Sequence, residues 1–191
     1  MNIEHIILSF GYPAIFFFMV ANGIISLPSS QFIYVTAGFF VPSGQLSLLL
    51  IVVFGTAGNF LGNVILYELS RRKGIKYIAR WKGFSEKKIM GLHTAFERRG
   101  PLIIIIGKFL PGIKVLVPAV AGIAHMNRVL YSCIIATTSM LWALGLTYFG
   151  VYFGKNYNSG TFGWSTALLL CIAAIAMYIF IRYVKKLSAV K

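Results

Sequence analysis

Two lysines flank a proline–glycine pair in an otherwise apolar part of the sequence. Residues 107–122 read GKFLPGIKVLVPAVAG and follow the run PLIIII. Lys108 and Lys114 can bind an anion, whereas Pro111 and Gly112 favour a turn, because proline lacks a backbone donor and glycine accepts unusual dihedral angles. Burying a lysine in a bilayer is costly unless it faces a cavity or a counter-charge. These four residues therefore predict an anion site at a turn within the membrane.

The alternative is that both lysines extend to the headgroup region on their long side chains. A helix over residues 101–107 would place Lys108 ~10 Å along the segment. Either lysine alone could reach a headgroup from there. Two lysines on either side of a turn favour the anion site.

The composition is that of an integral membrane protein. Of the 191 residues, 58% are hydrophobic and only 12% are charged, against about 25% in soluble domains. No formally charged side chain occurs from residue 5 to residue 67, which is too long for one crossing. Because no linker divides the chain, residues 1–191 predict a single all-α domain that passes several times through the plasma (inner) membrane of the cell.

The net charge of +14 is gathered into two segments beside apolar runs. Such segments are typical of the positive-inside rule and of contact with anionic lipids. We therefore expect a membrane partner and no nucleic acid. The segments are a basic cytoplasmic loop, residues 71–100, and a tail with Arg182, Lys185, Lys186 and Lys191.

Three uncharged runs, residues 46–67, 129–154 and 161–181, are long enough to span a bilayer. Two other apolar regions are broken: residues 5–42 by SLPSSQ, and residues 101–127 by KFLPGIKVLVP. A full crossing by 101–127 would put the basic tail on the side opposite the basic loop, against the positive-inside rule. We therefore expect this region to be a re-entrant hairpin.

The same reasoning makes residues 5–42 a hairpin that enters from the other side, although the charge pattern leaves open whether residues 5–25 cross fully. The predicted fold is an inverted repeat of two opposed re-entrant helical hairpins with about three full transmembrane helices. Repeats of this kind place a site near the bilayer midplane, between discontinuous helices.

Five motifs occur in order between about residues 15 and 155: ANGIISLPSSQFIYVTAGFF, GNFLGNVILYELSRRKG, FERRG, GKFLPGIKVLVPAVAGIAHM and LWALGLTYFGVYFG. Together they resemble the DedA family, whose shared region is also called the VTT or SNARE-associated Golgi protein domain. The resemblance implies two opposed hairpins. It also implies movement of lipids between leaflets, such as the polyprenyl phosphate carrier in bacteria.

The resemblance also implies site residues. Lys108 and Lys114 fall where the family typically has two arginines around its F-[IL]-P motif, and lysine keeps the charge but lacks the planar fork that binds phosphate bidentately. Where many members have acidic residues, this chain has Ala21, Ser30 or Gln31, and Asn63. The expected polar lining of the substrate site, besides the lysine segment, consists of Asn22, Pro28, Ser29, Ser30, Gln31, Asn59 and Asn63.

Two residues are candidates for proton coupling. Glu68 precedes Arg72 by four residues, so a simple i,i+4 ion pair is the alternative. His125 can titrate near neutral pH, or it is a polar residue at the hairpin rim. Asn59 and Asn63 share one helix face, where they either line a cavity or bond a neighbouring helix.

These observations predict a lipid flippase or scramblase for an anionic lipid, a polyprenyl phosphate or a phospholipid, with a second copy of the chain as a further candidate partner. No zinc spacing, nucleotide-binding loop or catalytic triad stands out, so we expect no enzyme, metal or cofactor. Two alternatives stay open: a proton-coupled exchanger of small ions or drugs, and a membrane assembly or homeostasis factor that transports nothing.

Overall fold

The computed structural model describes residues 3–25, 30–80, 86–109, 114 and 116–158. Every regular element in these ranges is an α-helix, which confirms the predicted all-α class for this part of the chain. The predicted span 161–181 lies outside the described residues. The helices are α1 (Ile3–Ile24), α2 (Ser30–Phe39), α3 (Leu48–Ile78), α4 (Glu86–Arg99), α5 (Leu102–Phe109), α6 (Leu116–Ile123) and α7 (Arg128–Asn158).

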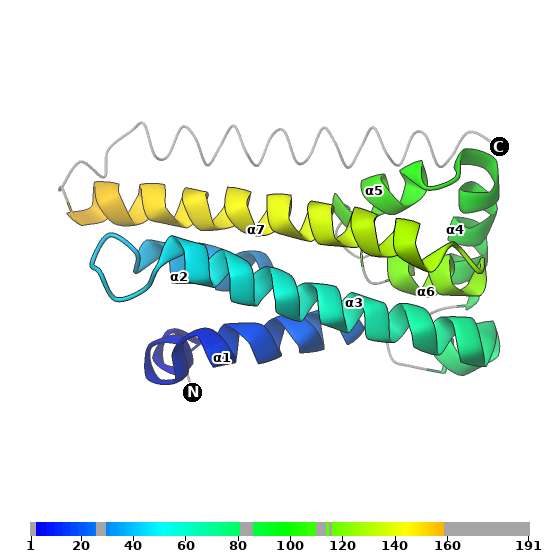
Figure 1. The fold of residues 1–191 in the computed structure, drawn as a ribbon, viewed down its shortest axis with the longest axis horizontal. Coiled ribbons are helices and arrows are strands. Elements are labelled where there is room, and N and C mark those ends of the chain that lie inside the picture. Colours follow the sequence, from blue (N-terminus) through cyan, green and yellow to red (C-terminus); the bar gives the residue numbers. More distant parts are fainter. Residues whose placement is uncertain (1–2, 26–29, 81–85, 110–113, 115, 159–191) are drawn as a thin grey trace.

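Two long antiparallel helices, α3 and α7, run the length of the bundle (Figure 1). Both are long and apolar enough to cross a membrane, with mean hydropathies of 2.0 and 1.7 in their most apolar windows. α3 covers the predicted span 46–67 from residue 48 onward, and α7 covers the whole predicted span 129–154. Large apolar side chains such as Val53, Leu61 and Leu141 are exposed on their outer surfaces, as a lipid environment allows.

The two broken segments lie at opposite ends of this pair (Figure 1). α1 and α2 lie toward the end where α3 begins, and the helical break between Ile24 and Ser30 falls at the predicted SLPSSQ. α5 and α6 lie toward the other end, with a break between Phe109 and Leu116 at the predicted lysine segment. Each pair runs toward the middle of the bundle and back. α1 is kinked near its start at Gly11, whose φ is 58°.

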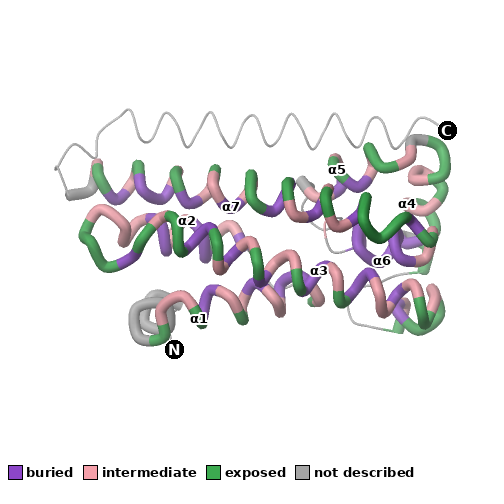
Figure 2. The backbone as a smooth tube through the Cα atoms, in the orientation of Figure 1, coloured by how far each residue is buried: buried purple, intermediate pink, exposed green. Residues whose placement is uncertain are grey.

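Each helix that follows a break packs against the long helix of the other half. α2 lies on α7, and α6 lies on α3. Glycines allow both approaches: a Cβ on Gly38 would overlap the Thr147 carbonyl oxygen, and a Cβ on Gly122 would overlap the Tyr67 carbonyl oxygen. The two halves are therefore interlocked, and α6 is almost wholly buried (Figure 2).

Apolar clusters fill both ends of the bundle. Near the α1–α2 end, Ile15, Met19 and Tyr34 pack with Ile51 and Ala143. Near the other end, the apolar face of the surface helix α4 packs its buried Ile89 against α3 and α6. This arrangement leaves the exposed lysines and arginines of α3 and α4 together at one end.

The close approach of α2 and α7 predicts that replacing Gly150 by alanine destabilises the fold. A Cβ on Gly150 would overlap the Val35 carbonyl oxygen and lie 3.0 Å from the Gly38 Cα. Gly150→Ala should therefore destabilise the fold by about 1–3 kcal/mol through overpacking. Gly145→Ala on the same helix is the matched control, because its Cβ would meet nothing within 4 Å. Thermal unfolding in detergent compares the variants, and equal stabilities would contradict this packing.

The predicted orientation can be tested with single cysteines in a chain that lacks Cys133 and Cys171. A membrane-impermeant maleimide should label sites at 73–99 and 185–191 only from the cytoplasmic side. Sites at 155–160 should react from outside, because the positive-inside rule fixes both basic segments within. If the two basic segments were labelled from opposite sides, residues 101–127 would cross the membrane and the re-entrant prediction would be wrong.

Candidate functional site

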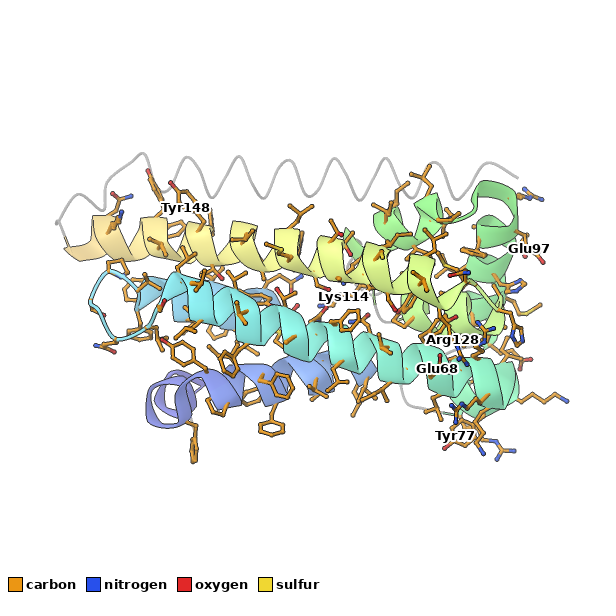
Figure 3. The ribbon with its side chains drawn as sticks, viewed as in Figure 1. Glu68, Tyr77, Glu97, Lys114, Arg128 and Tyr148 are labelled. Carbon is orange, nitrogen blue, oxygen red and sulfur yellow. The ribbon has the colours of Figure 1, made fainter. Side chains whose placement is uncertain are left out.

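A polar cavity of about 30 Å³ lies where the two broken segments meet. Side chains from both halves line it, although the bundle around it is largely apolar. Figure 3 places Lys114 midway along the bundle, between Tyr148 toward one end and Arg128 toward the other. The lining residues are Asn22, Gly23, Ser30, Asn59, Asn63, Lys108, Lys114 and Trp142.

Lys108 enters the cavity from the last turn of α5. Its ammonium donates to the Ser139 hydroxyl and, at 3.4 Å, to the Ile135 carbonyl oxygen. Both acceptors lie on α7, one helical turn apart. Because these oxygens are uncharged, they accept hydrogen bonds from Lys108 without neutralising its charge.

Lys114 lies just before α6 and reaches across to the other half of the molecule. Its Nζ donates to the hydroxyl of Ser30, the first residue of α2, at 3.0 Å. Ser30 is only 3% exposed, so this contact is inside the protein. The bond joins the lysine segment to the SLPSSQ segment across the cavity.

Asn59 and Asn63 form the α3 wall and bond to each other. Asn63 Nδ2 donates to the Asn59 backbone oxygen at 2.6 Å and to Asn59 Oδ1 at 3.1 Å. Asn59 Oδ1 also accepts the Ser139 hydroxyl at 3.0 Å. The spacing of the two asparagines predicted either a cavity lining or a hydrogen bond to a neighbouring helix. Both occur, because Asn59 and Asn63 line the cavity and Asn59 accepts from Ser139 on α7.

Positive charge dominates this site. Its described lining contains two ammonium groups and no carboxylate. Electrostatic attraction at low dielectric is strong, so the arrangement favours a bound anion. In this conformation a cavity of about 30 Å³ holds about one water molecule. A larger anion needs the walls to separate.

The structure brings together six of the residues predicted for the substrate site, and all six line the cavity. Gln31 is half-buried on α2 and does not line it. The predicted residues Pro28, Ser29, Pro111 and Gly112 lie outside the described part of the chain. The six residues are Asn22, Ser30, Asn59, Asn63, Lys108 and Lys114.

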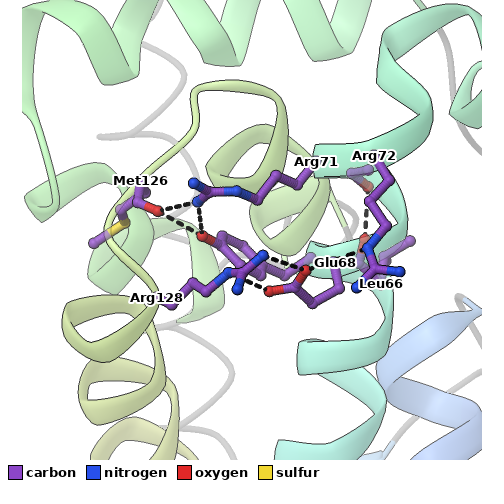
Figure 4. A network of polar contacts seen from close by, with 8 residues as sticks. Leu66, Glu68, Arg71, Arg72, Met126 and Arg128 are labelled. Atoms are coloured by element: carbon purple, nitrogen blue, oxygen red, sulfur yellow. Dashed lines mark hydrogen bonds and ion pairs between the residues drawn. The ribbon is translucent and has the colours of Figure 1, made fainter.

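Glu68 and His125 lie away from this cavity. Glu68 makes the expected contact with Arg72, at 3.8 Å between Nε and Oε2, but a shorter ion pair of 2.9 Å joins it to Arg128 at the start of α7. Beside it, Arg71 donates to the Met126 carbonyl oxygen at 2.8 Å (Figure 4). His125 is exposed, with a φ of 51°.

The sequence reasoning missed two lining residues, Gly23 and Trp142, and it also missed Ser139, which accepts a hydrogen bond from Lys108. Gly23 adjoins the predicted Asn22, and a Cβ there would lie 2.8 Å from the Asn63 backbone nitrogen. Ser139 and Trp142 belong to an uncharged span in which nothing marks one polar residue over another. Only the packing of α7 against α3 and α5 identifies them.

A helical bundle with long apolar helices, two opposed broken segments and an internal cationic cavity defines a membrane protein with a buried polar site. The VTT domain family model matches residues 27–152, which include the cavity residues Ser30, Asn59, Asn63, Lys108 and Lys114. This chain belongs to the VTT domain (DedA) family, as its motifs predicted.

Its relatives include a named transporter. The chain is 27% identical over 199 residues to Undecaprenyl phosphate transporter A of Staphylococcus aureus, covering 99% of this chain and 98% of that protein. It is 30% identical over 144 residues to the uncharacterized membrane protein YbfM of Bacillus subtilis, covering 73% of this chain and 88% of the relative. Protein DedA of Escherichia coli is 26% identical over 131 residues, covering 67% and 60%. No solved structure matches the chain.

Proposed function

We propose that this protein moves an anionic lipid, a polyprenyl phosphate, between the leaflets of the plasma (inner) membrane. The observation that carries the proposal is the pair of lysines in an internal cavity whose described lining contains no carboxylate. A lipid phosphate supplies the missing negative charge. The name of the Staphylococcus aureus relative, which spans nearly the same length, supports this choice of lipid.

The proposed architecture is an inverted repeat of two re-entrant hairpins, α1–α2 and α5–α6, with α3, α7 and residues 161–181 as full spans. The crossed packing of α2 on α7 and of α6 on α3 supports it, because a two-fold relation between the halves would exchange these two contacts. Inverted repeats place their substrate near the midplane, between broken helices. Lining residues from α1, α2 and α5 support that position for the cavity.

In the proposed cycle the phosphate replaces the uncharged partner of Lys114 and binds Lys108 beside the α7 acceptors of that lysine. Lys114 has one described hydrogen bond, to Ser30 on the opposite hairpin, and the phosphate competes for it. Breaking this bond separates the hairpin ends and enlarges the cavity, which otherwise has room for about one water molecule. The phosphate then crosses between the lysines while the polyprenyl chain stays in hydrocarbon.

Lysine binds phosphate as a point charge, without the bidentate fork of arginine. Lys108→Arg and Lys114→Arg should therefore keep or raise the rate of lipid movement, since charge is retained and hydrogen bonding improves. Lys108→Gln and Lys114→Gln should each abolish it. Fluorescently labelled polyprenyl phosphate in liposomes, with a membrane-impermeant quencher added outside, measures the rate.

Lys155→Gln is the matched control, because Lys155 is exposed in the last turn of α7, away from the cavity. Its rate should equal that of the unchanged protein. Full activity in the double variant Lys108→Gln, Lys114→Gln would refute the anion site and favour a factor that transports nothing. Flux of small ions or drugs without dependence on the lipid headgroup would favour the exchanger instead.

Energy coupling gives a second test of the proposal. With no carboxylate among the described lining residues, no acid there can exchange a proton for a lysine partner. Lipid movement should therefore run down its own gradient and be unaffected by a protonophore. Between about pH 6 and 8 the rate should change little, apart from titration of the lipid phosphate, whose second pKa is about 6 by analogy with phosphorylated side chains.

The Glu68→Gln variant tests the opposite possibility, that Glu68 couples lipid movement to the proton gradient. Glu68 is engaged with Arg128 and Arg72 at the basic end of the bundle, so its substitution should leave the pH response unchanged. Strong stimulation by an imposed proton gradient, lost in Glu68→Gln, would make Glu68 the coupling residue and contradict the proposed energetics.

A further inference from the structure

The hydroxyl of Ser139 is oriented differently from those of its neighbours. Serine and threonine inside helices commonly donate to the carbonyl four residues back. Ser70, Thr137 and Thr138 do so, at 2.7, 2.9 and 2.6 Å respectively. Ser139 instead donates across the bundle to Asn59 Oδ1, at 3.0 Å.

This orientation fixes what Ser139 can offer to Lys108. A hydroxyl has one proton and two lone pairs. Because the proton is directed to Asn59, a lone pair faces the Lys108 ammonium and accepts from it. The Ile135 carbonyl oxygen, to which the Ser139 hydroxyl does not donate, accepts a second proton of the ammonium at 3.4 Å and also accepts from the Thr138 hydroxyl at 3.3 Å.

The ammonium carries three protons, and these two acceptors both lie on α7. They hold it against the α7 wall, and no other described residue accepts its third proton, which we assign to a ligand in the cavity. Ser139 is only 2% exposed, so bulk water cannot replace its oxygen. Asn59 is in turn held by Asn63, which donates to both of its oxygens.

We propose that Ser139, oriented by Asn59, is a positioning residue that sets where Lys108 meets the phosphate of the transported lipid. The proposal rests on the proposed function and adds a residue to it. An uncharged oxygen holds the cation in place of a carboxylate, so the charge of Lys108 stays available to the ligand. Ser139 acts through Lys108 and need not touch the lipid.

The experiment measures initial rates of labelled polyprenyl phosphate movement in liposomes over a range of lipid concentrations. Ser139→Ala should raise the half-saturating concentration about tenfold, the effect of losing one hydrogen bond to a charged group. Its maximal rate should stay within about twofold, because Lys108 keeps its charge. Ser139→Thr restores a hydroxyl and should restore the half-saturating concentration.

Thr137→Ala is the matched control, two residues earlier on α7, where the one described hydrogen bond of the exposed threonine hydroxyl lies within its own helix. It should behave as the unchanged protein does. A merely structural role for Ser139 would lower the maximal rate and the melting temperature while leaving the half-saturating concentration unchanged. That result, or equal losses in Ser139→Ala and Ser139→Thr, would overturn the positioning role.

Failure of the proposed function gives a different pattern. The lipid-phosphate site is refuted if liposomes with the unchanged protein move lipid no faster than protein-free liposomes. It is also refuted if the Lys108→Gln variant moves lipid as fast as the unchanged protein. If Lys108→Gln is inactive but Ser139→Ala matches the unchanged protein at every concentration, only the role of Ser139 is refuted.

Discussion

The presence of two half-buried like charges within one apolar bundle is the constraint on which the other features depend. An ammonium group removed from water needs hydrogen-bond acceptors, and the cost is severe without them. Lys108 finds its acceptors on α7, and Lys114 finds Ser30 on α2. Both partners come from helices outside the segment that carries the lysines. Because Ser30 belongs to the other half of the chain, the hydrogen bond of Lys114 forms only when the two halves are assembled.

Assembly in turn requires the helices to approach closely. The crossed contacts of α2 with α7 and of α6 with α3 occur at glycines, where a Cβ would overlap a backbone oxygen of the partner helix. Association of helices in lipid depends on this kind of packing, because apolar side chains gain little from leaving hydrocarbon for protein. Glycines thus allow the helices that form the cavity to pack closely, and the polar residues between these helices determine which ligand the cavity can bind.

The sequence predicted the parts of this arrangement that follow from local composition. Helix breakers located both interruptions, uncharged runs located α3 and α7, and the spacing of Asn59 and Asn63 placed them on one face. It missed Ser139 because Thr137, Thr138 and Ser139 are adjacent and similar, and only the packing of α7 decides which one faces α3. It likewise missed the pairing of Glu68 with Arg128, which are 60 residues apart.

The central claim is that a lipid phosphate binds between Lys108 and Lys114. Solid-state NMR can test it directly by measuring dipolar dephasing between the ³¹P of polyprenyl phosphate and ¹⁵N-labelled lysine Nζ atoms in bilayers. The account predicts dephasing that persists in Lys155→Gln and disappears when Lys108 and Lys114 are both replaced by glutamine. Dephasing that survives the double replacement would place the phosphate at the surface lysines and contradict the account.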